Sequence, residues 1–171
     1  MLRAIVVSGA PGTGKSTAAN HLSHALHLPE LSLDFLKESL ADVLGTGDEQ
    51  WSDRLGDAAA EVVFRLSKNF DACVVEGWWR GQRRDRACLE FAGFVEVFCH
   101  CDPAVAADRF ALRRDSGRHP IHRDVINPNL IERVADLAAT VEPLGIGPLI
   151  RVDTTSSVDW PSLPTRVQDL M

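Results

Sequence analysis

The segment from Gly9 to Ser16 carries the clearest chemical signal in the chain. Its residues, Gly-Ala-Pro-Gly-Thr-Gly-Lys-Ser, fit the pattern G-x-x-x-x-G-K-[ST], in which glycines let backbone N–H groups converge on a phosphate. Lys15 offers a positive charge to the outer phosphates of a nucleotide, and Ser16 offers a hydroxyl to magnesium. We therefore expect ATP and Mg²⁺ to bind here, through Gly9, Ala10, Pro11, Gly12, Thr13, Gly14, Lys15, Ser16 and Thr17.

The segments around this loop have the order that such a site requires. An apolar run over residues 2–8 predicts a strand, and Ala18, Leu22, Ala25 and Leu26 then recur on one face of a predicted helix. The N-terminus of that helix adds a positive dipole end for the phosphate. Further strands are expected at 29–33, 72–76, 94–100 and 149–153, with helices at 34–44, 55–66, 82–91, 103–114 and from Asn127-Pro128 onward.

Strands that alternate with helices predict an α/β fold, here a three-layer fold with a parallel sheet of about five strands. The length of 171 residues predicts a single domain, residues 1–171. Ligands of such sheets bind at the carboxyl ends of the strands, so residues just after strands are the candidates for function.

Composition narrows the class of protein. The 18 Lys and Arg against 24 Asp and Glu give a net charge of -6, which argues against a general nucleic-acid coat. Nine of the 15 arginines nevertheless fall between residues 80 and 123, which favours a small anionic ligand. No apolar run has the length of a membrane span, and we expect a cytoplasmic protein without a membrane partner.

The four cysteines are expected to be reduced thiols: Cys73, Cys88, Cys99 and Cys101. Cys99-His100-Cys101 matches no common zinc spacing and lies in a predicted buried strand, so we interpret it as core.

The sequence lacks the signature segments of other classes of phosphate-loop protein. No Asn-Lys-x-Asp segment for guanine and no Leu-Ser-Gly-Gly-Gln segment of transporters occurs. The Asp-x-x-Gly match at Asp53–Gly56 lies inside a predicted amphipathic helix, and we interpret it as coincidence.

What remains resembles the small phosphate-loop kinases. The shared features are the phosphate loop, an Asp after the second strand, and an arginine-rich segment after the fourth strand. Within this group the chain is most similar to the predicted-kinase, AAA-domain-like family that includes chloramphenicol phosphotransferase. Zeta toxins and polynucleotide 5′-kinase domains are more distant. The resemblance covers nearly the whole chain.

The resemblance implies that Asp34 orients and deprotonates the acceptor hydroxyl, since it stands after the second strand as the family's Asp does. An alternative is that Asp34 caps the following helix. Relatives that act on polynucleotide ends carry Arg three residues later. Lys37 stands there instead and cannot make the same bidentate contact, so a nucleic-acid acceptor is disfavoured.

Four residues at the end of the third predicted strand are further candidates. Phosphate-loop enzymes commonly place an acid here for magnesium, so Glu76 is a candidate for the metal or the acceptor. Trp78 and Trp79 would either form an aromatic wall for the acceptor or pack beneath a loop. Arg80 is a candidate for an anionic acceptor.

The arginine-rich segment is predicted to be a lid over about residues 113–126. In the resembled family such arginines clamp the triphosphate and stabilise the transferred phosphoryl group, which implies this role for Arg113 and Arg118 and nucleotide binding by Arg109. Thr154 stands after the last strand, where relatives contact adenine. His119 and His122 receive no role.

These observations predict a kinase that transfers the γ-phosphate of Mg-ATP to a hydroxyl of a small molecule, as a monomer or homodimer. Lys15, Asp34, Arg113 and Arg118 are the predicted catalytic residues, and Asp34, Lys37, Trp78 and Arg80 the predicted substrate contacts. Two alternatives are a 5′-hydroxyl nucleic-acid or nucleoside kinase and a module that binds ATP without transfer.

Overall fold

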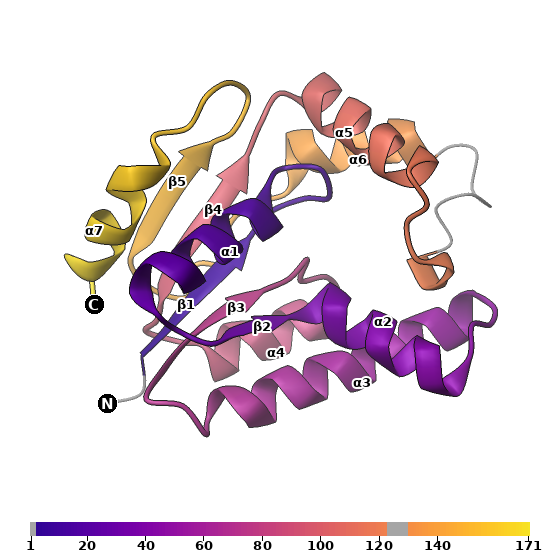
Figure 1. Ribbon diagram of the computed structural model, residues 1–171, viewed down its shortest axis with the longest axis horizontal. Coiled ribbons are helices and arrows are strands. Elements are labelled where there is room, and N and C mark those ends of the chain that lie inside the picture. Colours follow the sequence, from indigo (N-terminus) through magenta and orange to yellow (C-terminus); the bar gives the residue numbers. More distant parts are fainter. Residues whose placement is uncertain (1–2, 123–129) are drawn as a thin grey trace.

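A computed structural model describes residues 3–122 and 130–171. At its centre lies a parallel five-stranded sheet with the order β2-β3-β1-β4-β5 (Figure 1). The strands are β1 (Arg3–Ser8), β2 (Glu30–Ser32), β3 (Ala72–Glu76), β4 (Val95–His100) and β5 (Leu149–Asp153). This confirms the predicted three-layer α/β fold and its five strands.

Helices cover both faces of the sheet, because apolar side chains point from the strands to either side. One face packs on α3 (Glu49–Ser67) and α4 (Gln82–Glu90), where Val63, Phe64 and Ala87 are buried. The other face packs on α1 (Lys15–Leu26) and α7 (Leu163–Gln168) through Leu22 and Val167. Central strands buried on both faces explain the continuous apolar runs in the sequence.

Further helices lie toward the carboxyl ends of the strands (Figure 1). Helix α5 (Pro103–Asp115) packs against α6 (Leu130–Thr140), and Phe110 and Val134 are buried between them. Helix α2 (Leu33–Leu44) runs beside α3, and the short helix η1 (Pro120–His122) inserts Ile121 between α2 and α3. A second short helix, η2 (Trp160–Ser162), precedes α7.

A buried carboxylate joins β4 to the chain before β5. Glu96 is 0% exposed and accepts hydrogen bonds from the Ser8 hydroxyl at 2.5 Å and from the backbone N–H groups of Leu144 and Gly145 at 2.7 and 3.0 Å. A carboxylate in the core requires such donors, because unpaired burial of a charge is costly.

The boundaries differ from the prediction by a few residues. Helix α2 begins at Leu33, and Ser32 is its N-cap, because the Ser32 hydroxyl accepts from the Phe35 N–H. The alternative reading of Asp34 as the cap is therefore wrong, since Asp34 lies in the first turn. The predicted start of a helix at Asn127-Pro128 and residues 123–126 of the predicted lid lie outside the described residues. Among the described helices, none has the length and hydropathy of a membrane span.

Candidate active site

The phosphate loop connects β1 to α1 and is held in shape by its own backbone. The carbonyl oxygen of Ala10 accepts hydrogen bonds from the Thr13 hydroxyl at 2.8 Å and from Lys15 Nζ at 2.9 Å. Gly12 has φ +83°, and a Cβ there would collide with the carbonyl oxygen of Ala106 in α5. Glycine is therefore required at this position both for its backbone conformation and for the close approach of α5.

Glu76 lies beside this loop at the end of β3. Its carboxylate accepts from the Ser32 hydroxyl at 2.9 Å and lies 3.5 Å from the Ser16 hydroxyl. Burial raises the pKa of Glu76, while the charge of Lys15 opposes the rise. Burial also lowers the pKa of Lys15, with Glu76 and Asp34 opposing. The two groups thus stabilise each other's charge in a region that water reaches poorly.

The Ser16 and Glu76 oxygens fit the chemistry of magnesium. Both are hard oxygen donors and line the same pocket next to Lys15. Magnesium commonly takes one or two protein oxygens and completes its shell with water and phosphate oxygens.

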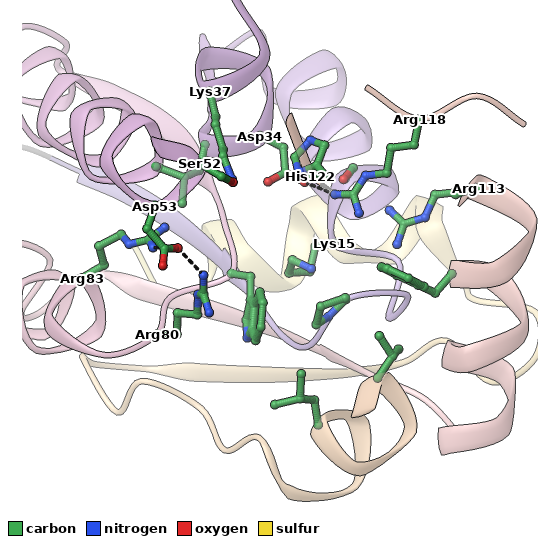
Figure 2. A pocket seen from close by; sticks show the side chains of 18 of the residues that line it. Lys15, Asp34, Lys37, Ser52, Asp53, Arg80, Arg83, Arg113, Arg118 and His122 are labelled. Atoms are coloured by element: carbon green, nitrogen blue, oxygen red, sulfur yellow. Dashed lines mark hydrogen bonds and ion pairs between the residues drawn. The ribbon is translucent and has the colours of Figure 1, made fainter. Parts of the chain in front are cut away.

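A pocket of about 410 Å³ extends from the phosphate loop along α2 to α3 and the start of α4. It brings together most of the residues that the sequence singled out. Figure 2 shows Arg113 and Arg118 on one side of Lys15 and Arg80 on the other, with Asp34 between them. The predicted site residues that line the pocket are Pro11, Lys15, Ser16, Asp34, Lys37, Glu76, Trp78, Arg80, Arg113 and Arg118.

Asp34 lies at the middle of this pocket and is surrounded by cations. Its Oδ2 atom accepts from Arg118 Nη2 at 2.9 Å, and 50% of its side chain is exposed, where it lines the pocket. Burial would raise the pKa of Asp34, but His122, Arg118 and two lysines more than offset this and lower it below its ordinary value. The carboxylate is therefore ionised at neutral pH and able to accept a proton.

Helix α2 presents a row of three acids to the segment that follows α5. Asp34, Glu38 and Asp42 are four residues apart, so they share one face of the helix. Arg118 contacts the first acid, His122 Nε2 lies 2.6 Å from Glu38 Oε1, and His119 Nε2 lies 3.2 Å from Asp42 Oδ1. We refer to Asp34, Glu38 and Asp42 as the acidic row. Through these three contacts the acidic row holds residues 118–122 next to the pocket.

Phe110 supports the two arginines predicted to act on the phosphoryl group. The guanidinium carbons of Arg113 and Arg118 lie 5.9 and 5.8 Å from the centroid of its ring. Phe110 is buried in α5 and lines the pocket. Cation–π contacts of this kind orient the guanidinium groups toward the region of Lys15 (Figure 2).

The end of the pocket far from the phosphate loop combines aromatic and charged groups. Lys37 Nζ donates to the Ser52 hydroxyl at 2.8 Å, and the Arg80 guanidinium lies 5.2 Å from the centroid of the Trp78 ring. Asp53 Oδ1 accepts from Arg80 at 2.6 Å. We call this region the acceptor end, lined by Lys37, Glu49, Ser52, Asp53, Gly56, Trp78, Arg80 and Arg83.

Arg109 and Thr154 do not line this pocket, and neither do the predicted loop residues Gly9, Ala10, Gly12, Thr13, Gly14 and Thr17. Arg109 donates to the hydroxyl and carbonyl oxygens of Thr154 at 3.0 and 2.7 Å, and the buried Thr154 hydroxyl donates to the Thr13 carbonyl at 3.0 Å. These contacts link the end of β5 to the phosphate loop, outside the pocket. Their predicted role in nucleotide binding stays a prediction. Trp79 is 4% exposed and stacks on Phe64, so its alternative reading as packing is the correct one.

Sequence reasoning missed several lining residues. Asp53 and Gly56 do lie in a helix, as interpreted, yet both line the pocket. Ser52, Asp53 and Gly56 interrupt the apolar face of α3, which was the available signal. His122 and Phe110 also line the pocket. Their segments approach α2 only in the folded chain, and no local sequence pattern predicts this approach.

The model of the family AAA_18, described as an AAA domain, matches residues 5–125, a range that includes most of β1 and all of η1. The chain belongs to this family. A comparison with curated proteins gives no significant match.

Solved structures extend the likeness of this AAA_18 chain over its whole length. A candidate kinase from Chloroflexus aurantiacus J-10-fl superposes with a TM-score of 0.87 at 28% identity, covering 100% of both chains. A gluconokinase from Sinorhizobium meliloti 1021 gives 0.61 at 19% identity, covering 99% of this chain and 91% of the other. Shikimate kinase from Acinetobacter baumannii in complex with shikimate gives 0.65 at 16%, covering 99% and 93%. The last two show the fold.

Proposed function

We propose that this protein is a kinase that transfers the γ-phosphate of Mg-ATP to a hydroxyl of a small molecule. The observation that carries the proposal is one pocket lined by Lys15 of the phosphate loop, the ionised Asp34, and the arginines Arg113 and Arg118. Phosphoryl transfer requires a donor site, a proton acceptor and cations around the transferred group, and these are the groups that meet here.

In this proposal the pocket residues have separate roles toward the phosphates, the metal and the transferred group. The backbone N–H groups of residues 9–17 and the Lys15 ammonium hold the phosphates, and Ser16 and Glu76 would hold Mg²⁺. When bound, Mg²⁺ supplies positive charge that neutralises phosphate oxygens. Arg113 and Arg118 stabilise the charge on the transferred group, since guanidinium groups are planar and permanently charged.

In the proposed phosphoryl transfer, Asp34 is the proton acceptor. The oxygen of the acceptor hydroxyl forms a bond to the γ-phosphorus of ATP. The bond from that phosphorus to the bridging oxygen breaks, and its electron pair leaves on ADP. The hydroxyl proton goes to an Asp34 carboxylate oxygen, which is ionised because the surrounding cations lower its pKa.

Several findings support a small-molecule acceptor. The pocket volume of about 410 Å³ suits a compact molecule. The names of the structural neighbours, which include a sugar kinase from Janibacter sp. HTCC2649, a gluconokinase and a shikimate kinase, refer to small hydroxylated compounds. The net charge of -6 and Lys37 in place of Arg disfavour a nucleic-acid end.

A transfer assay tests the proposal. The protein is incubated with γ-labelled ATP and magnesium, alone and with pools of small alcohols, nucleosides or a 5′-hydroxyl oligonucleotide. We expect label to move to a member of the small-alcohol pool, and Lys15→Ala to abolish that transfer. Transfer to the oligonucleotide would favour an end kinase, and ATP binding without transfer to any pool would favour a non-catalytic module.

A further inference from the structure

Lys37 is a cation at the acceptor end that forms no ion pair with any acid in the described part of the chain. It is half-buried, and its Nζ donates one hydrogen bond, to the neutral Ser52 hydroxyl at 2.8 Å. Ser52 in turn donates to the Ile121 carbonyl at 2.8 Å, so its lone pairs are directed to Lys37. None of the ion pairs found among residues 3–122 and 130–171 involves Lys37. An ammonium has three donors, and burying one without an anion is unfavourable.

Burial is the main cause that lowers the pKa of Lys37, and the nearby charges act on it in both directions. Asp34 and Asp53 raise the pKa, whereas Arg83 and Arg80 lower it. The ammonium thus lies among cations as well as acids, and an anion placed next to it would remove its unfavourable environment.

Arg80 provides a second, oriented cation in the same region (Figure 2). Asp53 accepts from its Nη2 atom at 2.6 Å, and the Trp78 ring lies against its guanidinium at 5.2 Å. Its neighbour Arg83 is neutralised more fully, because Asp57 accepts from its Nε at 2.9 Å and Asp53 lies 3.5 Å from its Nη2. Arg80 therefore keeps more of its positive charge for a ligand.

The charges at the acceptor end match an anion of one charge. Counted with Asp57, which pairs with Arg83, three cations face three carboxylates here, and Arg80 pairs with Asp53. Lys37 is the cation among them that no ion pair in the described part of the chain joins to an acid. A carboxylate would pair with this ammonium one to one, whereas a phosphate monoester brings close to two negative charges at neutral pH.

The distance from the proton acceptor limits the size of the ligand. Lys37 follows Asp34 by three residues on α2, so the two side chains share one helix face with Cβ atoms roughly 5–6 Å apart. A hydroxyl at Asp34 and an anion at Lys37 therefore belong to a molecule in which a few carbon atoms separate them.

We propose that the acceptor is a small hydroxy acid whose carboxylate binds between Lys37 and Arg80 while its hydroxyl lies at Asp34. This inference rests on the proposed kinase function and names its substrate class. The Lys37–Arg80 pair selects the acceptor by charge, and Trp78 provides an apolar face for the carbon skeleton.

The test compares three matched sets of acceptors in the γ-labelled transfer assay: short-chain polyhydroxy monocarboxylic acids, the primary amides of the same acids, and sugar phosphate monoesters. We expect kcat/KM for the best acid to exceed that for its amide by about tenfold or more, because the amide lacks the charge that Lys37 and Arg80 bind. Lys37→Gln should lower this ratio toward one, with any remaining preference due to Arg80, and Lys37→Arg should largely preserve it.

Lys68→Gln is the matched control, since Lys68 is an exposed lysine paired with Glu90 away from the pocket, and its ratio should equal that of the wild type. Thermal unfolding of each variant checks that it folds. Amides phosphorylated as well as acids, or phosphate esters preferred over acids, would overturn the carboxylate assignment while leaving the kinase intact. Transfer to none of the three sets, and to no other small alcohol, would overturn the proposed function and this assignment with it.

Discussion

Replacement of Asp34 by Asn tests the proton acceptor while keeping the shape of the side chain. The described ion pair of Asp34, with Arg118, joins side chains that are 50% and 17% exposed. A pair of this exposure contributes about 1 kcal/mol or less, so the free energy of unfolding should change little. Loss of a general base, in contrast, slows transfer by about 10²–10⁴-fold, which corresponds to about 3–5 kcal/mol in the barrier.

The pH dependence gives this prediction a second readout. The cations around Asp34 lower its pKa below the ordinary 3.8, so the ionised form that accepts a proton dominates at any pH above that value. Transfer should therefore show no loss from Asp34 protonation between neutrality and about pH 4. The loss that comes from Asp34 should appear only as the pH drops through its lowered pKa, below any loss from Glu76, whose pKa is raised; Asn should abolish the lower limb alone.

The assay measures kcat and KM for ATP and for the acceptor in the wild type and in Asp34→Asn, with Asp42→Asn as the control. Asp42 belongs to the same acidic row and contacts His119, but 71% of its side chain is exposed and it lies outside the pocket. The control should stay within about twofold of the wild type. Transfer by Asp34→Asn at an undiminished kcat would refute the role assigned to Asp34.

Two further substitutions test the scaffold, and a labelling experiment tests the buried thiols. Gly12→Ala should lower nucleotide affinity and the free energy of unfolding together, because its Cβ meets the backbone of α5; isothermal titration and urea unfolding measure the two. Glu96→Gln should cost about 1–3 kcal/mol in urea unfolding, since its amide N–H₂ group faces a hydrogen-bond donor at a site that holds only donors. Burial raises the pKa of Cys73 to about 11 and of Cys99 to about 12, so at pH 8 a maleimide should modify Cys88 first and reach these two only on unfolding; faster labelling of either would contradict their burial.

The sequence predicted the sheet and the position of the phosphate loop well, because both depend on local signals. Continuous apolar runs specify strands buried on both faces, and the glycine pattern specifies a loop whose backbone binds phosphate. Lys15, Ser16 and Glu76 line one pocket, as these patterns led us to expect, and their roles toward nucleotide and metal stay predictions.

The acceptor end was predicted less completely, because it is built by contacts between distant segments. Ser52 and Asp53 belong to α3, and they reach the pocket only because α3 packs beside α2 and next to the start of α4. His122 meets Glu38 across 84 residues of sequence. No periodicity or motif encodes such pairings, which depend on how whole helices pack.

The acidic row links the two halves of the proposed reaction energetically. Arg118, which we propose binds the transferred phosphate, donates a hydrogen bond to Asp34. Its positive charge is one of those that lower the pKa of Asp34. Any polyanion that draws Arg118 away removes that charge and makes Asp34 a stronger base. By reciprocity, an acceptor whose hydroxyl donates to Asp34 competes with Arg118 for that carboxylate and releases Arg118 for the polyanion. Donor and acceptor would therefore each favour the binding of the other through this single pair.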